Sequence, residues 1–309
     1  MTLTVLFAGT DDNWQTYRDQ LPIALAGAGL DAAVLRDATP ETVDYIVYSP
    51  KSGLTDFTPF TQTKAVLSLW AGVETIIDNN SLTQPLARMV DEGLALGMRD
   101  WVCGHVLRHH LGMDAQIVNP HHLWRPQAPP LARQRRVGIL GLGALGQTCA
   151  IALAGLGFDV AGWARSAKSL NGIACYDGQD GLRQILERSE ILVLLLPHTA
   201  ETEITLNCDT FPLLPDGAVV INPGRGALID DDALLAALER NVAHATLDTF
   251  RIEPLPHDHP FWRHQRITVT PHIASETRPE TASAFIAENI RRAEAGAPLL
   301  GLVDRRAGY

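Results

Sequence analysis

Short apolar runs alternate with amphipathic stretches along the whole chain of 309 residues. Short apolar runs bounded by turn residues are typical of strands buried in a parallel sheet, and the amphipathic stretches are typical of helices. In the first third of the chain we expect strands at 3–8, 45–48 and 65–69, and helices at 17–29 and 81–88. This alternation predicts an N-terminal α/β unit.

The alternation continues to the end of the chain. A long helical pattern at 97–119 and a proline-rich connector at 126–130 lead into it. Beyond the connector the expected strands lie at 137–140, 158–163, 191–196, 218–222, 245–247 and 267–270, and the expected helices at 147–155, 181–187 and 231–240. A last helix at 278–295 can fold back onto the N-terminal unit and make that domain discontinuous. We therefore expect an α/β fold built on doubly wound parallel sheets.

One of these strands is followed by glycines in the spacing G-x-G-x-x-G. They are Gly141, Gly143 and Gly146, with Ala144 and Leu145 between the last two. The first glycine permits a tight turn, the second lets the backbone approach a pyrophosphate, and the third lets the next helix pack close to the strand. Because a strand precedes the loop, and a helix and a second strand follow it, we expect it to bind a dinucleotide. The alternative is a glycine-rich βαβ turn without a ligand.

The formal net charge of −10 argues against partners such as nucleic acid or an anionic membrane surface. A local basic site can still hold an anionic substrate. The four cysteines, Cys103, Cys149, Cys175 and Cys208, form no C-x-x-C pair, which favours free thiols in a reducing compartment. No apolar run is long enough to span a membrane, and the N-terminus resembles a first strand and not a signal peptide. We therefore expect a cytoplasmic protein.

Three residues with complementary chemistry follow predicted strands in the second half of the chain. Arg225 lies in N-P-G-R-G-A, Glu253 in D-T-F-R-I-E-P-L-P and His272 in T-P-H-I-A-S. Open α/β sheets bind ligands at the carboxyl ends of their strands, so we expect these loops to converge. Each residue has an ordinary alternative as a solvated or structural side chain, but their common placement after the glycine loop favours an active site.

Together the three side chains suit the reduction of a 2-keto acid. The planar guanidinium of Arg225 can hold the carboxylate and polarise the adjacent carbonyl. His272 is the natural proton donor to the carbonyl oxygen, because imidazole titrates near neutral pH. Glu253, bonded to the other ring nitrogen, would orient the ring and favour the imidazolium.

Four segments, G-L-G-A-L-G, N-P-G-R-G-A-L-I-D, L-D-T-F-R-I-E-P-L-P and T-P-H-I-A-S, resemble signatures of the D-isomer-specific 2-hydroxyacid dehydrogenases, over about residues 70–292. The segments L-W-A-G-V-E and G-M-R-D-W-V, and the short N-terminal region, are similar to the glyoxylate/hydroxypyruvate reductase A branch of that family. The resemblance implies a central Rossmann domain at 98–278 and a discontinuous, flavodoxin-like substrate-binding domain at 1–97 and 279–309. It implies the same catalytic roles for the three residues above.

The resemblance also implies where the substrate binds. Backbone groups of Ala71, Gly72 and Val73 are expected to hold its carboxylate, since glycine allows the main chain close to a ligand. Trp70 and Tyr48 are expected to line the pocket. The ordinary alternatives are a strand-ending turn and packing of the aromatic rings in the core.

At the cofactor, the resemblance implies that Asp248 contacts the nicotinamide carboxamide. The turn at Leu196 and Pro197 is expected beside the adenosine ribose, and Asn222 is also expected at the nucleotide. The turn at 196–197 is equally compatible with a purely structural role.

The end of the second nucleotide-binding strand indicates which cofactor is used. Enzymes that use NAD usually place an acidic residue there, roughly 20 residues past the glycines, to bind the ribose 2′-hydroxyl. Here Trp163 is followed by Arg165, Ser166 and Lys168 instead. Two cations attract a 2′-phosphate that a carboxylate would repel, so we expect NADP(H) to be preferred, with NAD(H) possible. The alternative is that these are solvated loop charges.

Three further features concern metal sites, helix capping and subunit contacts. His109 and His110 are adjacent on a predicted helix and face different sides, so we expect no metal site. The cluster at 230–232 is expected to cap and charge the start of the next helix. The helix beginning near residue 97 has apolar residues on several faces, and the resemblance implies dimers, so we expect a homodimer through the region near 98–125.

The leading hypothesis is an NADPH-dependent reductase of small 2-keto acids, with glyoxylate and hydroxypyruvate as the best candidates. One alternative is a dehydrogenase of a bulkier 2-hydroxy acid. Another is a non-catalytic, nicotinamide-sensing binding protein with the same fold, although a sensor would not require Arg225, Glu253 and His272 together.

Overall fold

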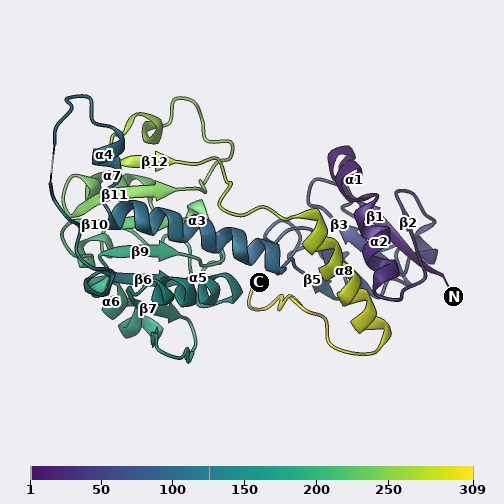
Figure 1. The fold of residues 1–309 in the computed structure, drawn as a ribbon. Coiled ribbons are helices and arrows are strands. Elements are labelled where there is room, and N and C mark those ends of the chain that lie inside the picture. Colours follow the sequence, from purple (N-terminus) through teal and green to yellow (C-terminus); the bar gives the residue numbers. More distant parts are fainter. Residues whose placement is uncertain (1, 125, 309) are drawn as a thin grey trace. The chain divides into compact units, whose positions relative to one another are not determined.

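The computed structural model describes residues 2–124 and 126–308, and the chain divides into two compact units (Figure 1). Unit 1 comprises Met1–Leu94 and Thr277–Tyr309, and unit 2 comprises Ala95–Glu276. Each unit is built on one sheet in which all strand pairs are parallel. The predicted α/β class is confirmed, and unit 1 is built from two separate segments of the chain.

The sheet of unit 1 has the strand order β2-β1-β3-β4-β5, which is the flavodoxin-like order. Its strands are β1 (Leu3–Ala8), β2 (Ala32–Leu35), β3 (Tyr45–Tyr48), β4 (Ala65–Ser68) and β5 (Leu86–Ala87). Its helices are α1 (Asp11–Tyr17), α2 (Gln20–Gly27) and α8 (Pro279–Glu294). The three helices share one core with the sheet, in which Leu21 and Leu25 of α2 pack with Ile286 and Ile290 of α8.

The sheet of unit 2 has the order β12-β11-β10-β9-β6-β7-β8, which is the Rossmann order with one strand added at the β12 edge. Its strands are β6 (Arg136–Leu140), β7 (Asp159–Ala164), β8 (Ala174–Asp177), β9 (Ile191–Leu194), β10 (Ala218–Asn222), β11 (Val242–Leu247) and β12 (Ile267–Val269). The helices are α3 (Glu92–His110), which begins in unit 1, α4 (Asp114–Ile117), α5 (Ala144–Gly155), α6 (Gly178–Arg188) and α7 (Asp231–Leu238). Helices α3 and α5 contribute to one core of the unit, and α6 and α7 contribute to the other.

Several expected elements differ from the structure. The helix predicted at 81–88 is wrong, because this segment forms turns and the short strand β5. Pro85 interrupts the helical pattern, since it lacks an N–H and keeps the preceding residue out of the helical region. The long helix predicted at 97–119 begins earlier, at Glu92, and is interrupted between α3 and α4, where Gly112 has a φ of +61°.

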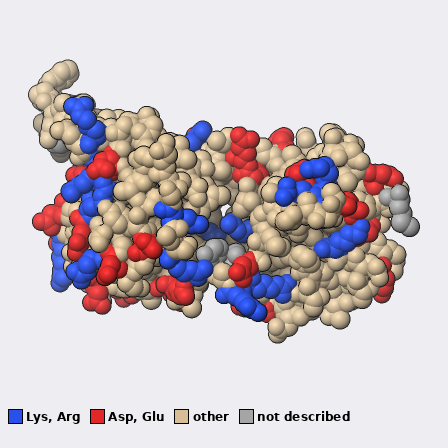
Figure 2. Space-filling view, turned by 90° about the horizontal axis from the view of Figure 1, so that it is seen from below, with Lys and Arg blue, Asp and Glu red and all other residues tan. Residues whose placement is uncertain are grey.

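Charges of both signs are interspersed on the face of the molecule shown in Figure 2. Over residues 2–124 and 126–308, no helix has the length and apolar character needed to cross a bilayer.

Candidate active site

The glycine loop follows β6, which lies between β7 and β9 in the sheet. Gly141 donates its N–H to Trp163 O at the end of β7 (2.8 Å), and its φ is +105°. A Cβ at Gly141 would lie 2.5 Å from Leu195 O, and a Cβ at Gly146 would lie 1.7 Å from Gly141 O. These two glycines are therefore required by the turn and by the close packing of α5.

Gly143 differs from the other two glycines. It is exposed at the N-cap of α5, and a Cβ built there would meet nothing within 4 Å in the described protein apart from the adjoining chain. Packing within the protein therefore does not require glycine at this position, whereas a ligand lying against the backbone would. The loop fits a pyrophosphate at the N-terminus of α5, because the first N–H groups of a helix attract anions and the predicted Ala144 and Leu145 begin that helix.

The three predicted catalytic residues follow neighbouring strands. β10 pairs with β11, and β11 pairs with β12, so that Asn222, Leu247 and Val269 lie side by side in register. Arg225 lies three residues beyond the end of β10, and His272 lies three residues beyond the end of β12. All three loops therefore leave the same edge of the sheet, as the sequence predicts.

His272 and Glu253 are in direct contact. His272 Nδ1 lies 2.7 Å from Glu253 Oε2, and Glu253 Oε1 accepts a hydrogen bond from Phe250 N at 2.9 Å. One carboxylate oxygen thus holds the imidazole while the other is fixed by the backbone. The ring is half-exposed, and its Nε2 is the nitrogen that can face a substrate.

The backbone of His272 is held by the fully buried Asp248. His272 N donates to Asp248 O at 2.9 Å, and the Asp248 carboxylate accepts from the hydroxyl of Thr270 and from the N–H groups of Ile273 and Ala274. These bonds stabilise the left-handed conformation of His272, whose φ is +55°. Both carboxylate oxygens of Asp248 are therefore engaged within the loop that carries the histidine.

The loop that carries Arg225 packs directly against the loop that carries Glu253. Asn222 Nδ2 donates to Arg225 O at 2.9 Å, and Arg225 Nη1 donates to Gly224 O at 2.8 Å. A Cβ at Gly226 would lie 2.0 Å from the carbonyl carbon of Phe250, so the two backbones touch. The backbone that carries the half-buried Arg225 side chain is therefore held in place.

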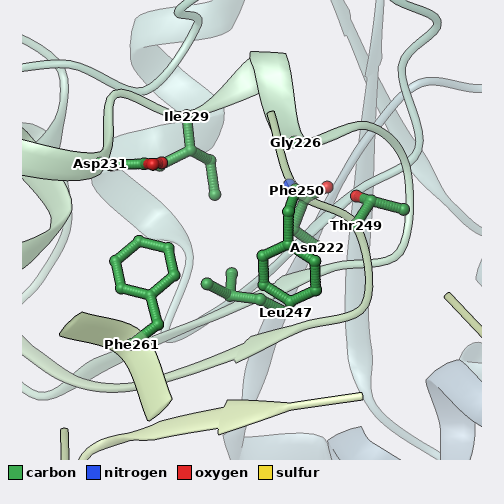
Figure 3. A pocket seen from close by; sticks show the side chains of 8 residues that line it. All are labelled: Asn222, Gly226, Ile229, Asp231, Leu247, Thr249, Phe250 and Phe261. Carbon is green, nitrogen blue, oxygen red and sulfur yellow. The ribbon is translucent and has the colours of Figure 1, made fainter. Parts of the chain in front are cut away.

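A small hollow lies beneath these loops (Figure 3). Its volume of about 10 Å³ is at the lower limit for holding one water molecule, so it is too small for a keto acid. It is lined by Asn222, Gly226, Ile229, Asp231, Leu247, Thr249, Phe250 and Phe261. Burial raises the pKa of the Asp231 carboxyl, against the opposing effect of His259 at 3.5 Å. The hollow is thus part of the support beneath the loops and not the substrate pocket.

Comparison with known proteins agrees with this geometry. Residues 103–274, more than half of the chain, match the family described as "D-isomer specific 2-hydroxyacid dehydrogenase, NAD binding domain". The chain belongs to this family. It is therefore an NAD(P)-dependent 2-hydroxyacid dehydrogenase, as the motifs predict.

Individual relatives show which members of the family this chain is similar to. Glyoxylate/hydroxypyruvate reductase A of Yersinia enterocolitica is 41% identical over 255 residues, which cover 80% of this chain and 82% of that protein. Two solved structures are similar over the full length of this chain. A D-isomer specific 2-hydroxyacid dehydrogenase of Xanthobacter autotrophicus Py2, in complex with NADPH and MES, has a TM-score of 0.92 at 38% identity and is covered to 100%. The NADPH-dependent glyoxylate/hydroxypyruvate reductase of Sinorhizobium meliloti, in complex with NADP and sulfate, has a TM-score of 0.84 at 32% identity and is covered to 99%.

In this dehydrogenase the predicted 2′-phosphate residues lie on the surface just beyond β7. Arg165, Ser166 and Lys168 are all exposed. Arg165 Nη1 lies 3.2 Å from Glu201 Oε2, in the loop after β9. Trp163, at the end of β7, is half-buried and donates Nε1–H to Gly178 O.

The turn after β9 lies against the glycine loop. Leu195 N donates to Leu140 O at 2.7 Å, and Leu195 O is the atom that a Cβ at Gly141 would meet. The predicted Leu196 is buried, and Pro197 is half-buried. The turn therefore borders the start of the glycine loop.

The predicted substrate residues of unit 1 differ in their surroundings. Tyr48 is 5% exposed and packs edge-on against Phe57, so it lies in the core of that unit. Trp70 is 38% exposed, and Lys51 Nζ lies 5.7 Å from its ring centroid. Ala71 and Gly72 follow as a half-buried turn, and Val73 is buried.

Arg251 is a positioning residue that the sequence analysis did not identify. Its guanidinium donates to Ile229 O at 2.9 and 3.2 Å and to Ala227 O at 3.2 Å, and it lies 3.5 Å from Glu203. It thus fastens the segment after Arg225 to the loop before Glu253. An arginine between two motif residues gives no local signal of this role, because its partners are carbonyl groups more than 20 positions away.

The histidines near α3 form a structural cluster. The rings of His109 and His244 lie 4.9 Å apart, and they contact Thr246 and Thr268 respectively. Burial lowers the pKa of His109 to about 3 and that of His244 to about 4, so both are neutral near pH 7. Within the part of the chain that the structure describes, no group of three or more His, Cys, Asp or Glu side chains is arranged to hold a metal ion.

Proposed function

We propose that this dehydrogenase reduces the small 2-keto acids glyoxylate and hydroxypyruvate to 2-hydroxy acids, with NADPH as the hydride donor. The observation that carries the proposal is the 2.7 Å contact between His272 and Glu253, on loops that leave the sheet beside the loop of Arg225. An oriented imidazole and a guanidinium beside it are the groups that protonation of a carbonyl next to a carboxylate requires. The names of the relatives from Yersinia enterocolitica and Sinorhizobium meliloti support the substrate class.

The side chains divide the reaction between them. Arg225 binds the carboxylate of the keto acid and polarises its carbonyl group. When bound, the reduced nicotinamide supplies a hydride to the carbonyl carbon. His272 donates the proton from Nε2 to the carbonyl oxygen, and Glu253 stabilises the imidazolium before the transfer. In this proposal unit 2 binds the nucleotide.

A turnover assay with NADPH over a panel of keto acids tests the proposal. Glyoxylate and hydroxypyruvate are expected to give the highest kcat/KM in a panel that includes pyruvate and phenylpyruvate. A higher kcat/KM for phenylpyruvate would assign the enzyme to bulkier substrates. Absence of turnover with every member of the panel would contradict an enzymatic role.

The preference for NADPH is tested by reversing the charge at Arg165. Arg165→Asp is expected to raise KM for NADPH by about tenfold or more and to change KM for NADH far less, because only NADPH carries the 2′-phosphate. Arg183→Asp is the matched control, since Arg183 is an exposed arginine of α6 that pairs with Glu187. A tenfold preference of the wild-type enzyme for NADH would contradict the assignment of NADPH as the preferred cofactor.

We propose further that the enzyme is a homodimer through the segment at 111–124. In Figure 1 the chain beyond α4 is a long loop along one edge of unit 2. The exposed apolar side chains of this segment are Leu111, Met113, Ile117, Val118, Leu123 and Trp124, and Trp124 is 93% exposed. Arg108 holds the base of the segment through two hydrogen bonds to Asp114. Several exposed apolar side chains in one segment with a fixed base are typical of a subunit contact.

Trp124→Asp is expected to convert this dimer to a monomer at micromolar concentration, because it replaces the most exposed apolar side chain of the segment with a charge. Light scattering measures the mass. Ile23→Asp is the control, since Ile23 is a similarly exposed apolar residue on α2, and it is expected to leave the mass unchanged. A monomeric wild-type protein would contradict the proposal.

A further inference from the structure

The loop after β9 presents a carboxylate beside the residues expected to bind the 2′-phosphate. Thr199 and Thr202 close this loop, since Thr202 Oγ1 donates to Pro197 O at 2.6 Å and Thr199 N donates to Thr202 Oγ1 at 2.9 Å. Glu203 N adds a bond to Thr199 O at 2.9 Å. The backbone at Glu201 is thus held inside a hydrogen-bonded turn, which fixes the place from which its side chain extends.

That place is opposite Arg165. The Oε2 atom of Glu201 lies 3.2 Å from Arg165 Nη1, and both side chains are more than half exposed. Arg165 follows β7 and Glu201 follows β9, the two strands that flank β6 and its glycine loop in the sheet. The ion pair therefore links the loops after β7 and β9, at the edge where a Rossmann sheet binds the adenosine half of a dinucleotide.

We propose that Glu201 is a specificity-determining residue that weakens the preference for NADPH over NADH. This proposal rests on the proposed function, in which Arg165 binds the 2′-phosphate. To bind that phosphate, the Arg165 guanidinium must leave or share the Glu201 carboxylate, and the carboxylate repels the phosphate directly. NADH has no phosphate at this position, so it binds without disturbing the ion pair. Glu201 therefore acts against one cofactor and not against the other.

The alternative role for Glu201 predicts the opposite change in Kd for NADPH. If Glu201 served to hold Arg165 ready for the phosphate, its removal would weaken NADPH binding. The sign of the change in Kd on neutralising Glu201 therefore separates the two roles.

The experiment measures Kd for NADPH and for NADH by fluorescence titration without keto acid, so that it does not depend on turnover. Glu201→Gln is expected to lower Kd for NADPH by about two- to fivefold, the range of an exposed ion pair, and to leave Kd for NADH unchanged or higher. Glu187→Gln is the matched control, because Glu187 pairs with the exposed Arg183 on α6. It removes the same charge and is expected to change neither Kd.

A second variant pair tests the route through Arg165. In an Arg165→Ala background, Glu201→Gln is expected to improve NADPH binding less than it does in the wild-type background, because the ion pair is already absent. An unchanged or raised Kd for NADPH in Glu201→Gln alone would overturn the proposal. A wild-type enzyme that does not bind NADPH would instead overturn the proposed function, so the two failures are distinguishable.

Discussion

His272→Ala is expected to lower kcat by about a hundredfold or more while leaving Kd for NADPH unchanged. The imidazole is the only group to which we assign transfer of a proton to the carbonyl oxygen, and Glu253 fixes its Nδ1 side at 2.7 Å. Its loss removes the proton donor without touching the glycine loop. Steady-state kinetics with hydroxypyruvate and a separate NADPH titration measure the two quantities.

Two further variants separate chemistry from folding. His272 has a φ of +55°, a conformation that asparagine adopts more readily than alanine, so His272→Asn preserves the backbone while removing the acid. It is expected to lose as much turnover as His272→Ala. Glu253→Gln is expected to lower kcat less, because the ring stays in place but loses the charge that favours imidazolium. Wild-type kinetics in both His272 variants would refute the assigned role.

Arg225→Ala is expected to raise KM for hydroxypyruvate by about a hundredfold and to lower kcat as well. Charge-assisted hydrogen bonds to a substrate carboxylate contribute on the order of 1.5–3 kcal/mol each, and a guanidinium can make two in parallel. The loop around Arg225 is fixed by Asn222 and Gly226, so the loss is assigned to the side chain and not to a rearranged loop. Arg225→Lys is expected to recover only part of the activity, since it keeps the charge but not the planar fork.

A substrate without a carboxylate is the sharper control for this prediction. Hydroxyacetone replaces the carboxylate of hydroxypyruvate by a methyl group. The wild-type enzyme should strongly prefer hydroxypyruvate, and Arg225→Ala should lose most of that preference. If the preference survives, another group holds the carboxylate and the role of Arg225 is wrong.

Much of the fold is predictable because it depends on neighbouring residues. The central strands of both sheets are buried on both faces, so they appear as continuous apolar runs, and β6, β9 and β10 follow the runs directly. The edge strands β2 and β8 are half-buried or exposed, so they lack such runs and were not expected. Pro85 made the helix predicted at 81–88 untenable, although its apolar residues suited one.

The candidate site, like the fold, has features that the sequence predicts and features that only the structure shows. The residue types at 225, 253 and 272 and their order after the glycine loop are local patterns that a sequence carries by itself. The contact between Glu253 and His272 depends on the register in which Leu247 pairs with Val269. Arg251 and Glu201 act through partners that the chain brings near from distant loops, so neither could be chosen from its neighbours in sequence.

The sequence by itself therefore determined the class of fold, and it predicted the dinucleotide loop and the chemical types of the proposed catalytic groups. Turn sterics and the burial of apolar runs act between residues close in the chain, and both leave local patterns. Only the tertiary structure decided which carboxylate meets which cation or imidazole. A side-chain contact of about 3 Å depends on strand register and on where separate loops end, and no local pattern encodes either.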